Sequence, residues 1–327
     1  MYPVHASAPQ TSPPTLPVFN ADTAFDLLRK QVEFGPRVLG TEAHHKALKF
    51  LQTEMSKYAD QTVDQQFFYR GMRVTNIIGI FHPAGKTVPD PHPVLLLAHW
   101  DTRPIADGPF SSELKKGPFH YGPQGWNRTD PIPGADDGAS GVAVLLELAR
   151  MFHEHHPSVG VLLLLDDGED YGDFEADNYR GDGVELGSRY FAKHYQDDSR
   201  FGHPAFGILL DMVGGKNMVI LPEQNSQNFA PSINDEVFGT ANSLGYADIF
   251  QNSGSQDVDD DHIALNTTGH IATIDLIQPL PAPGANNSDA YLQWHTLQDD
   301  VSHCSKRSLK AVGDTVAAVI YNQPATP

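Results

Sequence analysis

Two uninterrupted apolar runs, each followed at once by acidic or histidine residues, constrain the fold of this 327-residue chain more than any other feature. The first run is Pro93–Ala98, which leads into His-Trp-Asp, and the second is Val159–Leu165, which leads into Asp166–Asp170. Strands without polar alternation are typical of a sheet that helices cover on both faces. The chain is therefore predicted to contain buried, parallel strands.

Helical and extended patterns alternate around these two runs. The predicted helices span 22–32, 41–58 (capped by Thr41), 138–155, 187–196, 232–244 and 305–321, and the predicted strands span 62–69, 74–81, 93–98, 159–165, 206–211, 218–221 and 271–277. This order predicts one globular α/β domain with a central mixed, twisted β-sheet flanked by helices. We expect residues 1–20 to form an extended, Pro-rich segment and residues 21–327 to form this single domain.

Charge and composition exclude several classes of function. The net charge of −19, from 41 acidic and 22 basic side chains, argues against nucleic acid or an anionic membrane as partner. The chain has no run of 18 apolar residues, so we expect no membrane insertion, and residues 1–18 lack the apolar centre of a signal peptide. The single cysteine, Cys304, excludes a zinc cluster built on thiolates.

Acidic and histidine residues gather where the predicted strands end or the next helix begins. These residues are His99, Asp101, Asp136, Asp137, Glu169, Asp170, Asp211 and His295. Open α/β sheets bind ligands at this edge. A solvated surface explains any one of these groups but not all of them, because carboxylates that converge repel one another unless a cation lies between them. Aspartate and imidazole without thiolate suit a catalytic Zn²⁺.

The motifs of the chain resemble, in their order, those of the zinc-dependent aminopeptidase superfamily. They are His99–Asp101, Gly134–Gly141, Asp167–Asp170, Leu186–Arg189, Leu210–Gly214 and Trp294–Thr296. The resemblance covers roughly residues 40–322 and implies the fold of that superfamily. Its members include two-zinc aminopeptidases and one-zinc glutaminyl cyclases, which convert an N-terminal glutamine to pyroglutamate and release ammonia.

Two features favour the cyclases over the peptidases. The cyclases carry an Asp-Asp-His-Ile block and a tryptophan directly before the last histidine ligand, and this chain has Asp260–Ile263 and Trp294. An indole there would pack against the glutaminyl side chain and exclude water. A two-zinc aminopeptidase stays open as an alternative, as does a catalytically silent peptide-binding domain on the same scaffold.

The resemblance also implies which residues bind the metal and how many zinc ions each chain holds. One zinc ion per chain would be held by Asp137, Asp170 and His295, with the substrate's γ-carbonyl oxygen at the open position. In the two-zinc enzymes, the residues that match His99 and Asp211 hold the second metal. Both are present here, so the sequence does not exclude a second ion.

The resemblance implies catalytic roles for three further carboxylates. Glu169 would carry a proton from the substrate α-amine to the departing ammonia. Asp211 would accept a hydrogen bond from the leaving nitrogen, and Asp260 would share a proton with Asp211, although a helix cap explains Asp260 equally well.

The chain departs from the animal cyclases at three positions and here resembles the bacterial branch. Asp170 stands where those enzymes have a glutamate, and Asp275 stands where they have a histidine, which makes the proton-sharing network entirely carboxylate. The loop 171–186 has no tryptophan to contact substrate, so Phe174, Tyr171 or Tyr179 would replace it. Trp126 either lines the substrate pocket or anchors its own loop.

The resemblance finally implies the partners and the location. We expect peptides or proteins with N-terminal glutamine as substrates and a monomeric enzyme. The bacterial relatives suggest a periplasmic or secreted protein.

Overall fold

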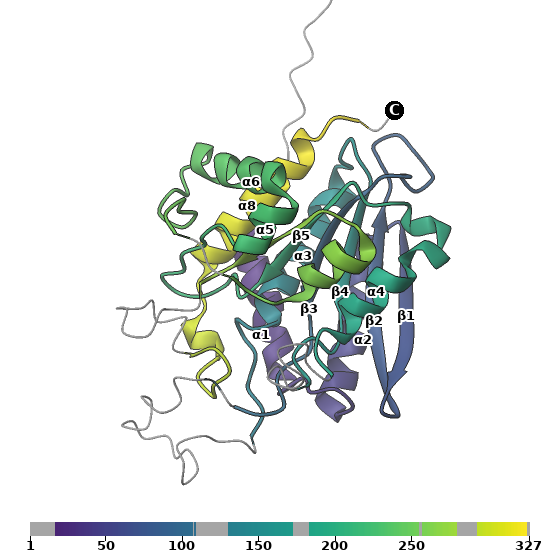
Figure 1. The fold of residues 1–327 in the computed structure, drawn as a ribbon. Helices are drawn as coiled ribbons and strands as arrows, with labels where there is room; N and C mark the ends of the chain where they lie inside the picture. Colours follow the sequence, from purple (N-terminus) through teal and green to yellow (C-terminus); the bar gives the residue numbers. More distant parts are fainter. Residues whose placement is uncertain are drawn as a thin grey trace, which may run out of the picture.

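The structure, a computed structural model, describes residues 17–106, 108, 130–172, 183–254, 257–279 and 293–325. In this part of the chain, six strands form one mixed sheet in the order β1-β2-β4-β3-β5-β6 (Figure 1). The strands are β1 Gln61–Tyr69, β2 Met72–Phe81, β3 Val94–His99, β4 Val161–Asp166, β5 Phe206–Asp211 and β6 Thr273–Ile277. β1, β2 and β4 pair antiparallel, whereas β4, β3, β5 and β6 pair parallel. The predicted mixed sheet is confirmed.

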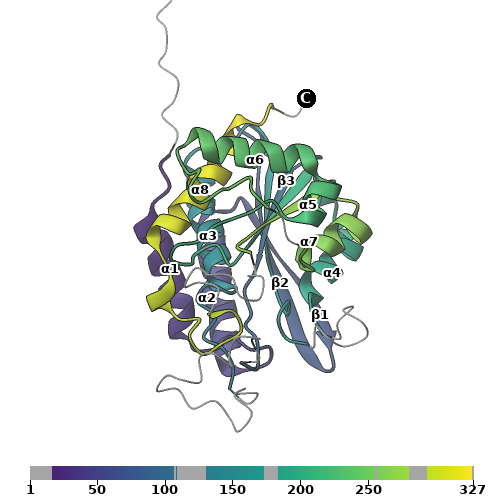
Figure 2. The ribbon, with the colours of Figure 1, turned by 60° about the vertical axis from the view of Figure 1, so that its left-hand side comes forward.

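Helices cover both faces of this sheet (Figure 2). The α-helices are α1 Ala21–Glu33, α2 Glu42–Tyr58, α3 Ala139–Glu154, α4 Leu186–His194, α5 Gln224–Phe229, α6 Pro231–Ser243, α7 Asp261–Ala264 and α8 Lys306–Asn322. Helices α1, α2, α3 and α8 lie on one face, and α4 and α7 lie on the other. This arrangement is the predicted α/β architecture.

The two apolar runs behave as expected of strands buried on both faces. Along β4, Leu163 and Leu165 point into the larger core beneath α3, whereas Leu162 and Leu164 point into the smaller core beneath α4. Every residue of β3 and β4 is buried. Because alternate side chains of a strand face opposite sides, a run that is apolar throughout fits only between two layers of helices.

One predicted strand is wrong, and two short α-helices of the described residues were not predicted. Residues 218–221 do not join the sheet: Ile220 forms a single bridge with Phe250, outside the named strands. The short helices α5 and α7 were missed because four to six residues carry too little periodicity to be recognised. Thr41 caps α2 as predicted, since its side chain accepts a hydrogen bond from the His44 amide.

Within the described ranges, no helix is both long enough and apolar enough to cross a lipid bilayer. The chain packs into the core from Phe19 onward, where the buried ring lies against α8. The division at residue 20 stays a prediction.

Candidate metal and catalytic site

The carboxyl ends of three parallel strands bring the predicted site residues together. His99 is the last residue of β3 and Asp211 is the last residue of β5, while Glu169 follows β4 closely. Asp137 lies just before α3, in the crossover from β3 to β4. The residues are far apart in sequence but meet because parallel strands end at one edge of the sheet.

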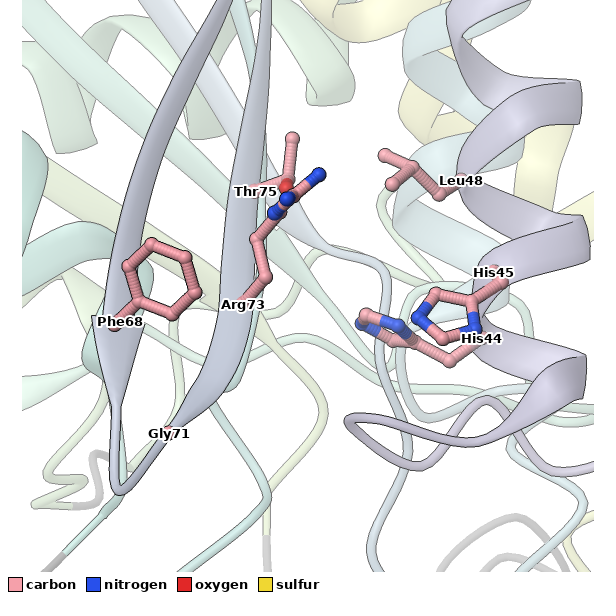
Figure 3. A pocket seen from close by; sticks show the side chains of 7 residues that line it. All are labelled: His44, His45, Leu48, Phe68, Gly71, Arg73 and Thr75. Atoms are coloured by element: carbon pink, nitrogen blue, oxygen red, sulfur yellow. The ribbon is translucent and has the colours of Figure 1, made fainter.

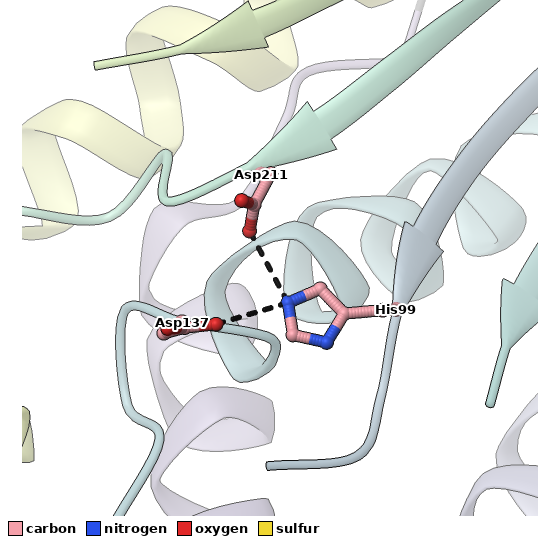
Figure 4. Close-up of side chains that lie close together, drawn as sticks. All are labelled: His99, Asp137 and Asp211. Carbon is pink, nitrogen blue, oxygen red and sulfur yellow. Dashed lines mark hydrogen bonds and ion pairs between the residues drawn. The ribbon is translucent and has the colours of Figure 1, made fainter. Parts of the chain in front are cut away.

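His99 lies at the centre of this edge (Figure 4). Its Nε2 is 3.1 Å from Oδ1 of Asp137 and 3.2 Å from Oδ1 of Asp211, and its Nδ1 is 3.4 Å from Oδ1 of Asp101. Burial alone would lower the pKa of His99, but hydrogen bonds to these three carboxylates outweigh it and raise the pKa well above its usual value. These contacts favour the protonated form of the His99 ring.

A second histidine completes the predicted ligand set. Asp137, Asp170 and His295 each offer a ligand atom, and these atoms lie within 4.8 Å of one another. Nε2 of His295 is 3.2 Å from Oδ1 of Asp170 and 3.6 Å from Oδ2 of Asp137. Oδ2 of Asp137 and Oδ2 of Asp170 are buried and have no hydrogen-bond partner among the described residues. Buried carboxylate oxygens rarely stay unpaired, so these atoms fit a bound divalent cation.

His99, Asp137 and Asp211 form another group whose ligand atoms lie within 4.8 Å of one another. Here the Oδ1 atoms of Asp137 and Asp211 both face Nε2 of His99 at hydrogen-bond distance. Both groups of possible ligands that the sequence analysis named therefore come together in the structure. The two oxygens without a hydrogen-bond partner among the described residues, on Asp137 and Asp170, both belong to the group with His295.

Two buried carboxylates fix the turns that carry the ligands. Asp299 accepts hydrogen bonds from the amides of Asp136 and Asp137, at 2.7 and 3.2 Å. Asp101 does the same for Glu169 and Asp170, at 3.0 and 3.2 Å. Asp101 thus acquires a structural role that the sequence did not assign, and Asp299 was missed altogether.

Gly138 shows how tightly this site is packed. It has a φ of +88°, and a Cβ there would lie 2.7 Å from the carbonyl oxygen of Asp101 and 3.0 Å from the ring of His99. Only glycine avoids both the steric clash and the backbone strain.

Arg103 supports the short ligand Asp170. Its Nη1 donates to Oδ1 and to the carbonyl oxygen of Asp170, at 3.3 and 3.2 Å, and to the carbonyl oxygen of Gly172 at 3.2 Å. Burial raises the pKa of Asp170 to about 6, although the nearby His295 opposes the rise. For Asp137, burial also favours the neutral form, but His99 outweighs it and lowers the pKa.

Glu169, the predicted proton carrier, is a buried carboxyl group near His99. Burial raises its pKa well above the usual value; His99 opposes the rise, whereas the carboxylates of Asp170 and Asp211 add to it. Its Oε2 is 3.8 Å from Nδ1 of His99, and about a tenth of its side chain is exposed. A carboxyl group with a raised pKa can take and return a proton near neutral pH.

Asp260 and Asp275 extend the acidic cluster away from the metal ligands. Asp260 caps α7, because its side chain accepts a hydrogen bond from the Asp261 amide at 2.6 Å. Burial raises the pKa of Asp260 well above normal, and the charges of Asp275 and Asp211 add to the rise. The capping role is thus confirmed, and the same carboxyl group is also electrostatically coupled to Asp211.

A histidine lies near this acidic cluster, although the predicted all-carboxylate network stays a prediction. His262, on α7, brings its Nδ1 to 4.0 Å from Oδ2 of Asp275 on β6. Sequence reasoning placed His262 in a family block but gave it no role.

Comparison with known proteins agrees with this geometry. The model of peptidase family M28 matches residues 76–320. The chain belongs to peptidase family M28. This assignment confirms the resemblance to the zinc-dependent aminopeptidase superfamily that the motifs indicated.

Two solved structures are similar to this M28 chain over nearly its whole length. One is the glutaminyl cyclase of Bacteroides thetaiotaomicron bound to N-acetylhistamine, with 36% identity and a TM-score of 0.78; the match covers 94% of this chain and 100% of the other. The second is a Zn-dependent exopeptidase from Parabacteroides distasonis ATCC 8503, with 36% identity, a TM-score of 0.79 and the same two coverages.

The chain is also 23% identical, over 251 residues, to aminopeptidase YwaD of Bacillus subtilis (strain 168). The match covers 75% of this M28 chain but only 44% of the aminopeptidase, so the chain spans less than half of that relative's length.

A buried histidine on α2 supports the loop of Glu169 in this M28 domain from behind. Nε2 of His44 is 2.8 Å from Oδ1 of Asp167, and its ring stacks on Trp100 with centroids 4.3 Å apart. His44 also lines a groove of about 400 Å³ between α2 and the β1–β2 hairpin, whose lining side chains are drawn in Figure 3. The His44 imidazole is thus buried and pairs with the Asp167 carboxylate.

Of the aromatic residues predicted to contact substrate, some lie within the described residues and some do not. Trp126 and Phe174 lie outside the described residues, as does Tyr179. Trp294 is half-buried, and its indole stacks on the ring of His295, one of the predicted ligands.

Proposed function

We propose that this M28 chain is a zinc-dependent glutaminyl-peptide cyclotransferase, which converts the N-terminal glutamine of peptides to pyroglutamate and releases ammonia. The observation that carries the proposal is the position of Trp294 against His295, in a chain that is 36% identical to a glutaminyl cyclase over 94% of its length. A flat aromatic wall beside a metal ligand suits a small amide side chain better than a peptide bond that water must reach.

Asp137, Asp170 and His295 would hold the zinc ion, because two of their buried oxygens lack hydrogen-bond partners among the described residues. When bound there, zinc supplies Lewis-acid stabilisation of the negative charge that develops on the substrate's γ-carbonyl oxygen. We propose one zinc ion per chain, since the two buried oxygens without a hydrogen-bond partner among the described residues, on Asp137 and Asp170, both belong to the group with His295.

The reaction is an intramolecular acyl transfer. The substrate's α-amine forms a bond to its own γ-carbon, the bond between that carbon and the amide nitrogen breaks, and ammonia leaves. Glu169 takes the proton that the α-amine loses and gives it to the leaving nitrogen. Since one residue supplies both nucleophile and electrophile, the site needs only to fold the substrate and to handle its charges.

Asp211 and Asp260 serve the leaving group. Asp211 ends β5 beside His99 and accepts a hydrogen bond from the departing nitrogen. The raised pKa of Asp260 favours its neutral form next to the charge of Asp211, so the two carboxyl groups share a proton. Asp275 belongs to the same network.

An aminopeptidase is the second candidate. The group of His99, Asp137 and Asp211 has the donor atoms for a second ion, and the similarity to aminopeptidase YwaD favours hydrolysis of an N-terminal residue. The two reactions differ in their products, which makes them easy to separate.

We also propose that the enzyme acts as a monomer on peptides or proteins outside the cytoplasm. Gel filtration and fractionation of the producing cells test these two points.

The function is tested by mass spectrometry of a peptide that begins with glutamine. A cyclotransferase yields a product that keeps every residue and lacks one ammonia. A product that is shorter by its first residue would instead identify an aminopeptidase.

A further inference from the structure

A buried pair, His262 and Glu223, lies behind the carboxyl cluster and has no role in the mechanism above. Both side chains are fully buried, and Nε2 of His262 is 3.2 Å from Oε2 of Glu223. On its other side, Nδ1 of His262 is 4.0 Å from Oδ2 of Asp275. The imidazole is thus placed between two carboxylates.

The surroundings of Glu223 favour its ionised form. It caps α5, and its two oxygens accept hydrogen bonds from the amides of Asn225, Ser226 and Val258 and from the hydroxyl of Ser226, at 2.6 to 3.2 Å. Burial alone would raise the pKa of Glu223, but His262 and these donors lower it to about 2. A fixed negative charge therefore faces one edge of the His262 ring.

The same contacts connect Glu223 to the strand that carries Asp275. The Ser226 hydroxyl, which donates to Glu223, accepts a hydrogen bond from the Asp275 amide at 2.9 Å. Both oxygens of the Asp275 carboxyl group and both ring nitrogens of His262 are buried without a hydrogen-bond partner among the described residues, and Nδ1 of His262 lies 4.0 Å from Oδ2 of Asp275.

Three consecutive side chains at the start of α7 point to three different partners. The Asp260 carboxyl group interacts with Asp211 and Asp275, Asp261 accepts a hydrogen bond from the Ser188 hydroxyl, and His262 faces Glu223. The position of the Asp260 carboxyl group therefore depends on how the two residues after it are held.

We infer that His262, held in place by Glu223, is a positioning residue that keeps the carboxyl groups of Asp260 and Asp275 beside Asp211, where the leaving nitrogen departs. This inference rests on the proposed function. His262 touches neither substrate nor metal; it acts through the two aspartates. Its loss should therefore lower kcat with little effect on KM or on metal content.

The test compares the variants His262→Gln, Glu223→Gln and the double variant with the wild type. Each zinc-loaded protein is assayed for ammonia release from a peptide that begins with glutamine, and zinc content and the melting temperature are measured on the same samples. Glu147→Gln is the matched control: Glu147 is also a fully buried carboxylate, but it lies in the middle of α3 and bonds to Asn20 and Arg150.

We expect kcat to fall roughly 10- to 100-fold in each single variant, a part of the 10²–10⁴ that acid–base catalysis contributes. KM and zinc per chain should stay within about twofold of the wild type, and the control should keep the wild-type kcat. The double variant should lose no more than the worse single variant, because the two residues act as one unit.

Three results would overturn the inference: a kcat near that of the wild type in His262→Gln, losses that multiply in the double variant, or an equal loss in Glu147→Gln. A wild-type protein that releases no ammonia would contradict the proposed function instead, so the two failures are distinguishable.

Discussion

The indole of Trp294 stacks on the imidazole of His295, with ring centroids 4.0 Å apart and planes inclined by 24°. His295 also has a positive φ of 54°, a conformation that a non-glycine residue keeps only when its surroundings hold it. The stacked indole of Trp294 thus fixes the plane of the His295 ring, whose nitrogen we propose as a zinc ligand. Outer partners of this kind orient metal ligands.

Replacing Trp294 by alanine should lower kcat/KM for a glutamine peptide by roughly 10- to 100-fold, because both the pocket wall and the support of His295 are lost. Zinc affinity should fall less than activity. Trp294→Phe keeps an aromatic ring and is the matched control, and it should retain most of the activity. Steady-state kinetics and zinc titration measure both effects; an alanine variant as efficient as the wild type would exclude a role for the indole.

Glu169→Gln should reduce kcat by about 10²–10⁴-fold and leave zinc bound, since the amide cannot carry the proton while the three ligands are unchanged. The readouts are ammonia release and metal content. Asp101→Asn makes a useful comparison, because Asp101 holds the amide of Glu169 without taking part in proton transfer. Wild-type activity in Glu169→Gln would remove Glu169 from the mechanism.

The buried Glu185 should make stability depend on pH. Burial raises its pKa from 4.5 to about 7, although Arg189 opposes the rise. The folded state thus holds this proton more tightly than the unfolded state, so the contribution to stability is complete below pH 4.5 and is lost as the pH rises through 7.

Glu185→Gln removes that dependence. The free energy of unfolding of the variant minus that of the wild type should increase by up to about 3 kcal/mol when the pH is raised from 4.5 to 8. Denaturant titrations of both proteins at the two pH values measure the change. A stability difference that is independent of pH contradicts the raised pKa.

Removal of the metal should destabilise the fold, because Asp137 and Asp170 then face each other without a cation. At a free zinc concentration of 100 times the Kd, binding adds about 2.7 kcal/mol to the free energy of unfolding. Melting curves with chelator and with restored zinc show the effect. Asp137→Asn should respond much less to zinc; an equal response in both proteins would place the ion elsewhere.

The parts of the site that the sequence predicted are those that parallel strands bring together. His99, Asp211 and Asp170 follow buried apolar runs, and strand ends meet at one edge regardless of the distance between them in sequence. The apolar character of β3 and β4 likewise predicted helices on both faces.

The supporting residues could not be predicted in this way. Asp299 holds the amide of Asp136 across 163 positions of sequence, and nothing in its local pattern indicates that contact. His262 lies in α7 and Glu223 caps α5, and both helices are too short to show periodicity. Their contacts depend on how the helices and strands pack against one another, which only the three-dimensional structure shows.

The most direct test of the cyclase assignment is a paired assay on one preparation whose zinc content has been counted. A peptide that begins with glutamine is followed at the same time for ammonia release and for release of its first residue. We predict ammonia release that reaches its maximum at one zinc per chain, without measurable release of the residue. Release of the first residue with maximal activity at two zinc ions per chain would contradict the account.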